Sequence, residues 1–105
     1  MSKLTELMYK SLQEHLEEIK QKPFSEILEM PSYSDKVIKV NDNSFTLATW
    51  KNQQEDRTLE IVVQEYYTGW AYRLFGAGKM MADGFLIDSN GNISVLPDEI
   101  RWKYC

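Results

Sequence analysis

The residues best suited to chemistry lie in one aromatic-rich stretch in the second half of the chain. This stretch holds Tyr66, Tyr67, Trp70, Tyr72 and Phe75 within ten residues, directly after Glu65. Aromatic rings wall small-ligand pockets, and a single carboxylate can anchor a ligand or act as a base. The candidate ligand-binding residues are therefore Glu65, Tyr67, Trp70 and Tyr72. The simpler alternative is that these rings complete the core and a dimer interface.

A second stretch has oxygen-bearing side chains at the spacing of a calcium-binding loop. Asp88, Asn90, Asn92 and Glu99 occupy positions 1, 3, 5 and 12 of that spacing. The sixth position needs glycine for its left-handed turn, and this chain has the β-branched Ile93 there. The stretch therefore predicts a hairpin that turns at Asn90-Gly91, with no metal and no cofactor.

The remaining reactive side chains form no recognisable catalytic arrangement. The run Gly76-Ala77-Gly78-Lys79 is too short for a phosphate-binding loop and lacks a hydroxyl residue after the lysine. His15 is the single histidine and falls at the border of an apolar helical stripe, while Cys105 is the last residue. The sequence therefore assigns no catalytic residue and favours a protein that is not an enzyme.

The elements that must position these side chains follow from the spacing of apolar residues. An N-terminal stripe repeats at three- and four-residue steps through Leu4, Leu7, Met8, Leu12, Leu16 and Ile19. This period predicts an amphipathic helix that Ser2 caps and Pro23 ends. Residues 24–30, between two prolines, predict a short second helical turn.

From Asp35 onward the alternation of apolar and polar residues predicts strands and hairpins. A turn at Asp42-Asn43 would set Val40 opposite Phe45, and an odd-length loop within 52–56 keeps the apolar residues of the next strand on the same face. A turn at Thr68-Gly69 would set Tyr67 opposite Trp70, Glu65 opposite Tyr72 and Val63 opposite Leu74, all on the same apolar face.

The segment 101–104 alternates basic and aromatic residues and predicts a last edge strand. Residues 1–105 are thus expected to form a single α+β domain, in which the N-terminal helix and the short second turn pack on a bent antiparallel meander of five or six strands.

Composition limits the partners. Twelve Lys and Arg residues against sixteen Asp and Glu residues give a formal net charge of −4, which argues against a nucleic-acid partner. A basic and aromatic set keeps nucleic-acid binding as a third alternative; it comprises Arg73, Lys79, Arg101, Trp102, Lys103 and Tyr104. The lack of a signal-peptide pattern and of a long apolar run predicts a soluble cytoplasmic protein without membrane contact.

The leading functional hypothesis is a small non-enzymatic binding protein. Residues 1–30 carry six acidic and four basic side chains, so the helix could contact a basic partner or a second copy in a homodimer. Inhibitors and immunity-type proteins that cover a basic active site fit this outline. The alternative is a small-molecule-binding or enzymatic domain that uses a pocket around Glu65, Tyr67, Trp70 and Tyr72.

Overall fold

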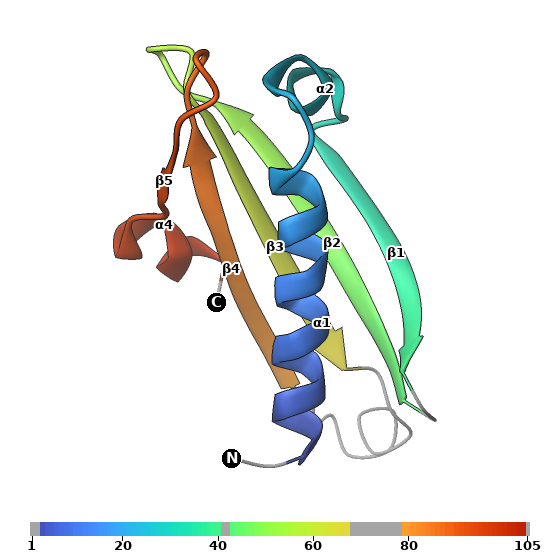
Figure 1. Ribbon diagram of the computed structural model, residues 1–105. Helices are drawn as coiled ribbons and strands as arrows, with labels where there is room; N and C mark the ends of the chain where they lie inside the picture. The colour runs from blue at the N-terminus through green and yellow to red at the C-terminus, as the bar shows by residue number, and fades with distance from the viewer. Residues whose placement is uncertain (1–2, 41–42, 68–78, 105) are drawn as a thin grey trace.

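One long helix lies across one face of a five-stranded antiparallel sheet (Figure 1). The computed structural model describes residues 3–40, 43–67 and 79–104. The elements in chain order are α1 (Lys3–Lys20), α2 (Phe24–Glu29), β1 (Tyr33–Val40), β2 (Asn43–Gln53), β3 (Leu59–Tyr67), β4 (Lys79–Ile87), β5 (Ile93–Val95) and α4 (Asp98–Lys103). The strands pair in the order β1-β2-β3-β4-β5, so the predicted α+β fold and its meander are confirmed.

The helical part of the chain follows the predicted stripe. Met8, Leu12, Leu16 and Ile19 are buried on the sheet-facing side of α1, while the predicted cap Ser2 lies outside the described residues. After Pro23, α2 forms the predicted second turn and buries Ile27 in the core. Both helices therefore lie on the same face of the sheet, which we call the covered face.

The core forms where side-chain parity predicts it. Leu47, Leu59, Ile61 and Val63 pack together with α1, and the half-buried Ile38 lies against them. These residues alternate along β1, β2 and β3 and share the covered face because successive side chains of a strand point to opposite sides. Leu74, which was expected among them, lies outside the described residues.

The register of β1 on β2 differs from the prediction by two residues. Ile38 stands opposite Phe45, whereas the expected turn at Asp42-Asn43 placed Val40 there. A shift of two residues keeps every side chain on its face, so hydrophobic alternation cannot distinguish these two registers. Between Gln53 and Leu59 the loop spans 54–58, which has the predicted odd length but extends beyond the predicted range of 52–56.

The partner of β3 was predicted wrongly. β3 pairs with β2 on one side and β4 on the other, so Glu65 stands between Leu47 and Met81 rather than opposite Tyr72. Likewise, Tyr67 opposes Lys79 rather than Trp70. The prediction assumed the shortest hairpin, although the apolar residues of β4 alternate at positions that satisfy the same face equally well.

The C-terminal segment is a helix, which corrects the predicted edge strand at 101–104. Pro97 precedes α4, acidic Asp98 and Glu99 occupy its first turn, and basic residues occupy its last turn. Both charge signs complement the helix dipole, and proline is well tolerated at a helix start. The predicted hairpin before it is confirmed, since β4 and β5 pair around Gly91, whose φ is 84°.

Gly84 lets β3 and β4 approach closely. A Cβ atom at this position would lie 2.0 Å from the backbone oxygen of Ile61. Such a contact is far inside van der Waals distance, so a larger residue would force the strands apart. Glycine at 84 therefore permits the local geometry of the sheet next to α4.

Candidate interaction surface and the buried acid

Glu65 lies at the interface between α1 and the sheet, closed off from solvent. Its side chain is 0% exposed, and Ser11 Oγ of α1 lies 2.5 Å from its Oε2 atom. Its Oε1 atom has no hydrogen-bond partner within the described parts of the chain. Burial raises the pKa of Glu65 from 4.5 to about 7, and the bond from Ser11 acts in the opposite direction.

The hydrogen bonds around Ser11 agree with a neutral carboxyl group. Ser11 Oγ also lies 3.0 Å from the Met8 carbonyl oxygen and 3.1 Å from that of Leu7, and a hydroxyl has a single proton to donate. When Glu65 is protonated, its own O–H can be directed at Ser11 Oγ, and the serine proton is then free for the helix carbonyls. The protonated form thus satisfies this buried group better than the charged form.

The structure brings together only part of the predicted aromatic pocket. Tyr67 ends β3 on the covered face, two residues after Glu65, and its ring centroid lies 5.9 Å from that of Phe45. Trp70 and Tyr72 lie outside the described residues. A small cavity of about 130 Å³ lies beside this region, lined by Leu7, Lys10, Ser11, Glu14 and Val40.

Two further polar contacts join α1 to the sheet. His15 Nε2 lies 3.0 Å from Thr49 Oγ1, and burial lowers the pKa of His15, with a smaller contribution from the positive charge of Lys36. Gln13 Nε2 donates to Asp83 Oδ2 at 2.9 Å. These contacts fix the helix over the strands, so His15 covers the edge of the core as the sequence predicted.

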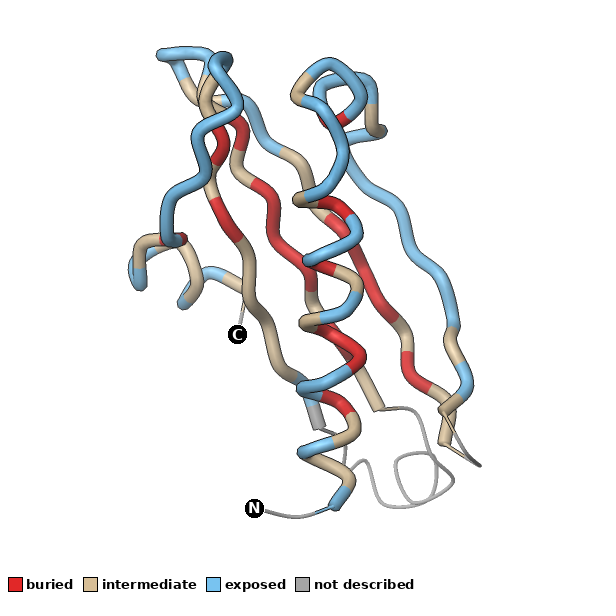
Figure 2. The backbone as a smooth tube through the Cα atoms, viewed as in Figure 1, coloured by how far each residue is buried: buried red, intermediate tan, exposed pale blue. Residues whose placement is uncertain are grey.

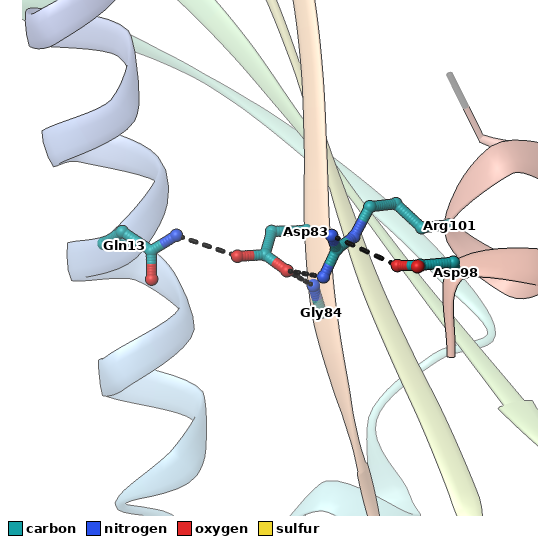
Figure 3. Close-up of polar contacts among 5 residues, drawn as sticks. All are labelled: Gln13, Asp83, Gly84, Asp98 and Arg101. Atoms are coloured by element: carbon teal, nitrogen blue, oxygen red, sulfur yellow. Dashed lines mark hydrogen bonds and ion pairs between the residues drawn. The ribbon is translucent and has the colours of Figure 1, made fainter. Parts of the chain in front are cut away.

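Asp83 also connects β4 with α4 (Figure 3). Its Oδ1 atom accepts a bond from the Gly84 backbone N–H at 2.8 Å and lies 3.3 Å from Arg101 Nη2. Arg101 in turn lies 3.6 Å from Asp98 within α4. One carboxylate therefore contacts α1, β4 and α4, which holds the C-terminal helix beside the β4 edge.

The opposite face of the sheet, which we call the open face, carries an aromatic cluster. The ring of Trp50 lies 4.5 Å from that of Tyr33 and 6.0 Å from that of Tyr104 between centroids. Within the described ranges, α1 and α2 lie on the covered face, so these rings stay half-buried or exposed. We define the open-face cluster as Tyr33, Trp50, Gln64, Tyr66 and Tyr104.

Gln64 holds this cluster in place. Its Oε1 atom accepts bonds from Trp50 Nε1 and from the Tyr66 hydroxyl, each at 2.8 Å. Its Nε2 atom donates to the Tyr104 backbone oxygen at 2.8 Å, and Asn52 donates to the Tyr104 hydroxyl at the same distance. The cluster is thus pre-organised by hydrogen bonds that fix three of its rings.

Sequence reasoning missed the open-face cluster, although one signal for it was present. The parity that places Phe45 and Val63 inward also places Trp50, Gln64 and Tyr66 on the other face. Tyr104 carried no such signal, because it joins the cluster only through the α4 helix. The aromatic surplus of the sequence is therefore divided between the two faces.

Comparisons of the chain with protein-family models, with curated proteins and with solved structures give no match. Among residues 3–40, 43–67 and 79–104, no helix has the length and apolar character needed to cross a membrane. Across the same ranges, no three His, Cys, Asp or Glu side chains converge as a metal site would require.

Proposed function

We propose that this chain is a non-enzymatic interaction protein that contacts a protein partner through the open face of its sheet. The observation that supports this most strongly is the pre-organised open-face cluster, in which half-exposed rings are held by Gln64. Aromatic residues are enriched at protein interfaces, and rings fixed before binding lose little conformational entropy on association.

Neighbouring apolar side chains extend this surface. Val37 of β1 is 69% exposed and stands on the same face as Tyr33, and Met80 of β4 is exposed on that face as well. An exposed apolar patch around aromatic anchors is typical of a recognition surface. The combination favours an interface over a solvated sheet face.

The outer face of α1 supports the proposal less strongly. Glu14, Glu17 and Glu18 surround a shallow depression there, but Lys10 lines the same depression and Lys20 pairs with Glu17 at 3.4 Å. The net charge of −4 still favours a basic partner at long range. Inhibitors and immunity-type proteins that cover a basic active site remain one class of interaction protein that this proposal includes.

Partner capture with matched variants tests the proposal. The tagged full chain is used to capture partners from its native host, and its own assembly is measured by size exclusion with light scattering. We expect Tyr33→Ala to reduce partner capture or self-assembly by about tenfold, because hot-spot aromatics dominate interfaces. Tyr9→Ala, which removes a comparably exposed ring from α1, is the control and should retain both. Equal capture by the two variants contradicts the proposal, as does a strict monomer without partner that turns over a small substrate.

One observation favours the alternative of a small-molecule domain around Glu65, Tyr67, Trp70 and Tyr72. The Glu65 carboxyl group is buried with an unbonded Oε1 atom, and the nearby cavity reaches its partner Ser11. A metabolite screen read by thermal shift tests this reading. Shifts that wild type shows and Glu65→Gln and Trp70→Ala both lose would support it, and shifts unchanged in these variants would exclude it.

A further inference from the structure

β1 is an edge strand whose outer side has no partner among the described residues. It stands at one end of the strand order, and its residues are exposed from Tyr33 to Val37. Figure 2 shows β1 in the exposed colour along most of its length, beside β2 and β3, which are drawn mostly in the buried and intermediate colours. The other end of the sheet differs, because short β5 and helix α4 lie along the edge of β4.

The hydrogen bonds between β1 and β2 determine which backbone groups of β1 point outward. Lys51 N–H donates to the Ser32 oxygen at 2.9 Å, one step before the first pair of the ladder. Bonded and non-bonded pairs alternate in an antiparallel ladder, so the even-numbered residues of β1 bond to β2. The odd-numbered residues Tyr33, Asp35, Val37 and Lys39 therefore direct their N–H and C=O groups away from the sheet.

A second copy of the chain can use these groups when the two β1 strands pair around a twofold axis. Such a pairing must bring odd-numbered residues opposite odd-numbered residues, because these carry the outward groups. If the axis passes at Val37, Asp35 stands opposite Lys39 of the second copy, and the same pair forms again on the other side of the axis. Val37 then meets Val37 of the second copy on the open face.

The charges of β1 disfavour the neighbouring registers. An axis at Lys36 sets this lysine against itself, and an axis at Asp35 does the same for the carboxylate. An axis at Ile38 places Val37 opposite Lys39 and leaves Asp35 without an opposite charge. Directly opposed like charges destabilise a strand pair, whereas opposite charges stabilise it. The Val37 register thus has two complementary charge pairs and no repulsive pair.

We infer that β1 is a self-association edge, through which two copies of this chain pair antiparallel around Val37 into one continuous sheet. The inference rests on the proposed function and names its partner as a second copy. In this arrangement both open-face clusters lie on the same side of the joined sheet, next to the strand pair. The opposing reading is that Lys36 and Lys39 protect the edge from pairing, as lysines on edge strands commonly do.

Charge variants of the full chain distinguish these readings. Sedimentation equilibrium at low salt, from about 1 µM to about 1 mM, covers the affinities expected of a small interface. We expect wild type to dimerise within this range. In the Val37 register, residue 35 of one copy stands opposite residue 39 of the other. Asp35→Lys therefore sets two lysines against each other in both pairs, and Lys39→Asp sets two carboxylates against each other. Each variant should weaken dimerisation by about tenfold or more. The two variants mixed together, and the double swap in one chain, should restore the dimer.

Lys36→Asp is the matched control for Lys39→Asp. It changes the net charge equally, but in the Val37 register this residue stands opposite Ile38 of the second copy and has no charge partner. It should therefore dimerise within about threefold of wild type, because surface charges away from an ion pair have small effects. Circular dichroism of each variant confirms that the exposed substitutions leave the fold intact.

Three outcomes overturn the inference. These are a wild-type chain that stays monomeric throughout, single charge variants that dimerise as well as wild type, and mixed variants that fail to pair. If the mixed variants fail while Tyr33→Ala still reduces partner capture and Tyr9→Ala does not, the proposed function stands and self-pairing through β1 is wrong. If capture also survives Tyr33→Ala, both are wrong.

Discussion

The two faces of the sheet use polar groups in opposite ways. On the covered face, Glu65 and Ser11 form a polar pair within an apolar layer, and burial raises the pKa of the acid against the opposing effect of the Ser11 hydrogen bond. On the open face, Gln64 bonds three aromatic residues that remain partly accessible to solvent. The covered face accordingly supplies most of the folding stability. On the open face, the hydrogen bonds mainly fix the positions of side chains that remain at the surface.

The two edges of the sheet repeat this division. At the β4 edge, the contact between Asp83 and Arg101 holds α4 against the sheet. The helix would therefore obstruct the addition of a further strand at this edge. At the β1 edge, the outward backbone groups are left to solvent within the described part of the chain. Tyr104, at the end of α4, contacts only part of the open face, and the β1 edge has no partner among the described residues. Binding is therefore expected where the exposed part of that face meets that edge.

The largest difference between the faces should be in stability. Leu16 packs between α1 and the sheet and is 1% exposed. Leu16→Ala should lower the free energy of unfolding by about 2–5 kcal/mol, because the smaller side chain leaves a cavity in the core. Val37→Ala on the open face should change it by about 0.5 kcal/mol or less. Urea denaturation followed by circular dichroism measures both. Equal costs at the two sites would contradict the assignment of stability to the covered face.

The pH dependence of stability should follow Glu65. Its pKa is about 7 in the folded chain and near 4.5 when unfolded, so the folded state holds the proton more tightly. This stabilisation is complete below about pH 4.5 and is lost as pH rises through 7, a decrease of roughly 3 kcal/mol. Denaturation midpoints of wild type and Glu65→Gln across this range test it.

The glutamine variant serves as the reference because it cannot titrate at residue 65. His15, whose pKa burial lowers, acts in the opposite direction in part of the same range, and its contribution cancels in the difference between the two curves. The difference should therefore decrease steadily from pH 4.5 to 7. A difference independent of pH would show that Glu65 is ionised throughout and that the helix does not seal it from water.

A smaller effect is expected at the centre of the open face. Gln64→Ala removes the acceptor of Trp50 Nε1 and the Tyr66 hydroxyl, which should cost about 1–2 kcal/mol of stability because both groups stay partly buried. The same substitution should weaken self-association, since the rings lose their fixed positions. Denaturation and sedimentation of one sample measure both. Unchanged association would separate the cluster from the interface.

The smallest effect should come from the contact of α4 with the sheet. Arg101→Gln removes ion pairs with Asp83 and Asp98 that are partly exposed, so the loss should be about 0.5–1 kcal/mol and should shrink at high salt. Lys103→Gln, which removes an exposed charge from the same helix, is the control. A loss above that of Gln64→Ala would mean that the β4 edge contributes more stability than the open face.

The sequence predicted the covered face well because periodicity reports burial. The stripe from Met8 to Ile19 and the alternation through Leu59, Ile61 and Val63 correctly identified the buried residues. The exact register of β1 and the partner of β3 could not be derived, since several pairings keep the same side chains inward. Periodicity therefore predicts on which face of the sheet a side chain lies. The choice of neighbouring strand and its register depends on the length and geometry of the connections.

The open face was harder to predict because its contacts join residues without a local pattern. Trp50 and Gln64 meet only through the β2–β3 register, and Tyr104 reaches them from a segment that was expected to be a strand. Of the predicted ligand-binding residues, Glu65 and Tyr67 lie on the covered face, and the roles of Trp70 and Tyr72 remain predictions.

Amide hydrogen exchange of β1, measured by NMR as a function of protein concentration, tests the self-association edge most directly. The amides of Lys36 and Ile38 bond to β2 and should be protected at every concentration. The amides of Val37 and Lys39 point outward and should become protected only as the concentration rises. Rapid exchange of these two amides at all concentrations would contradict pairing through β1.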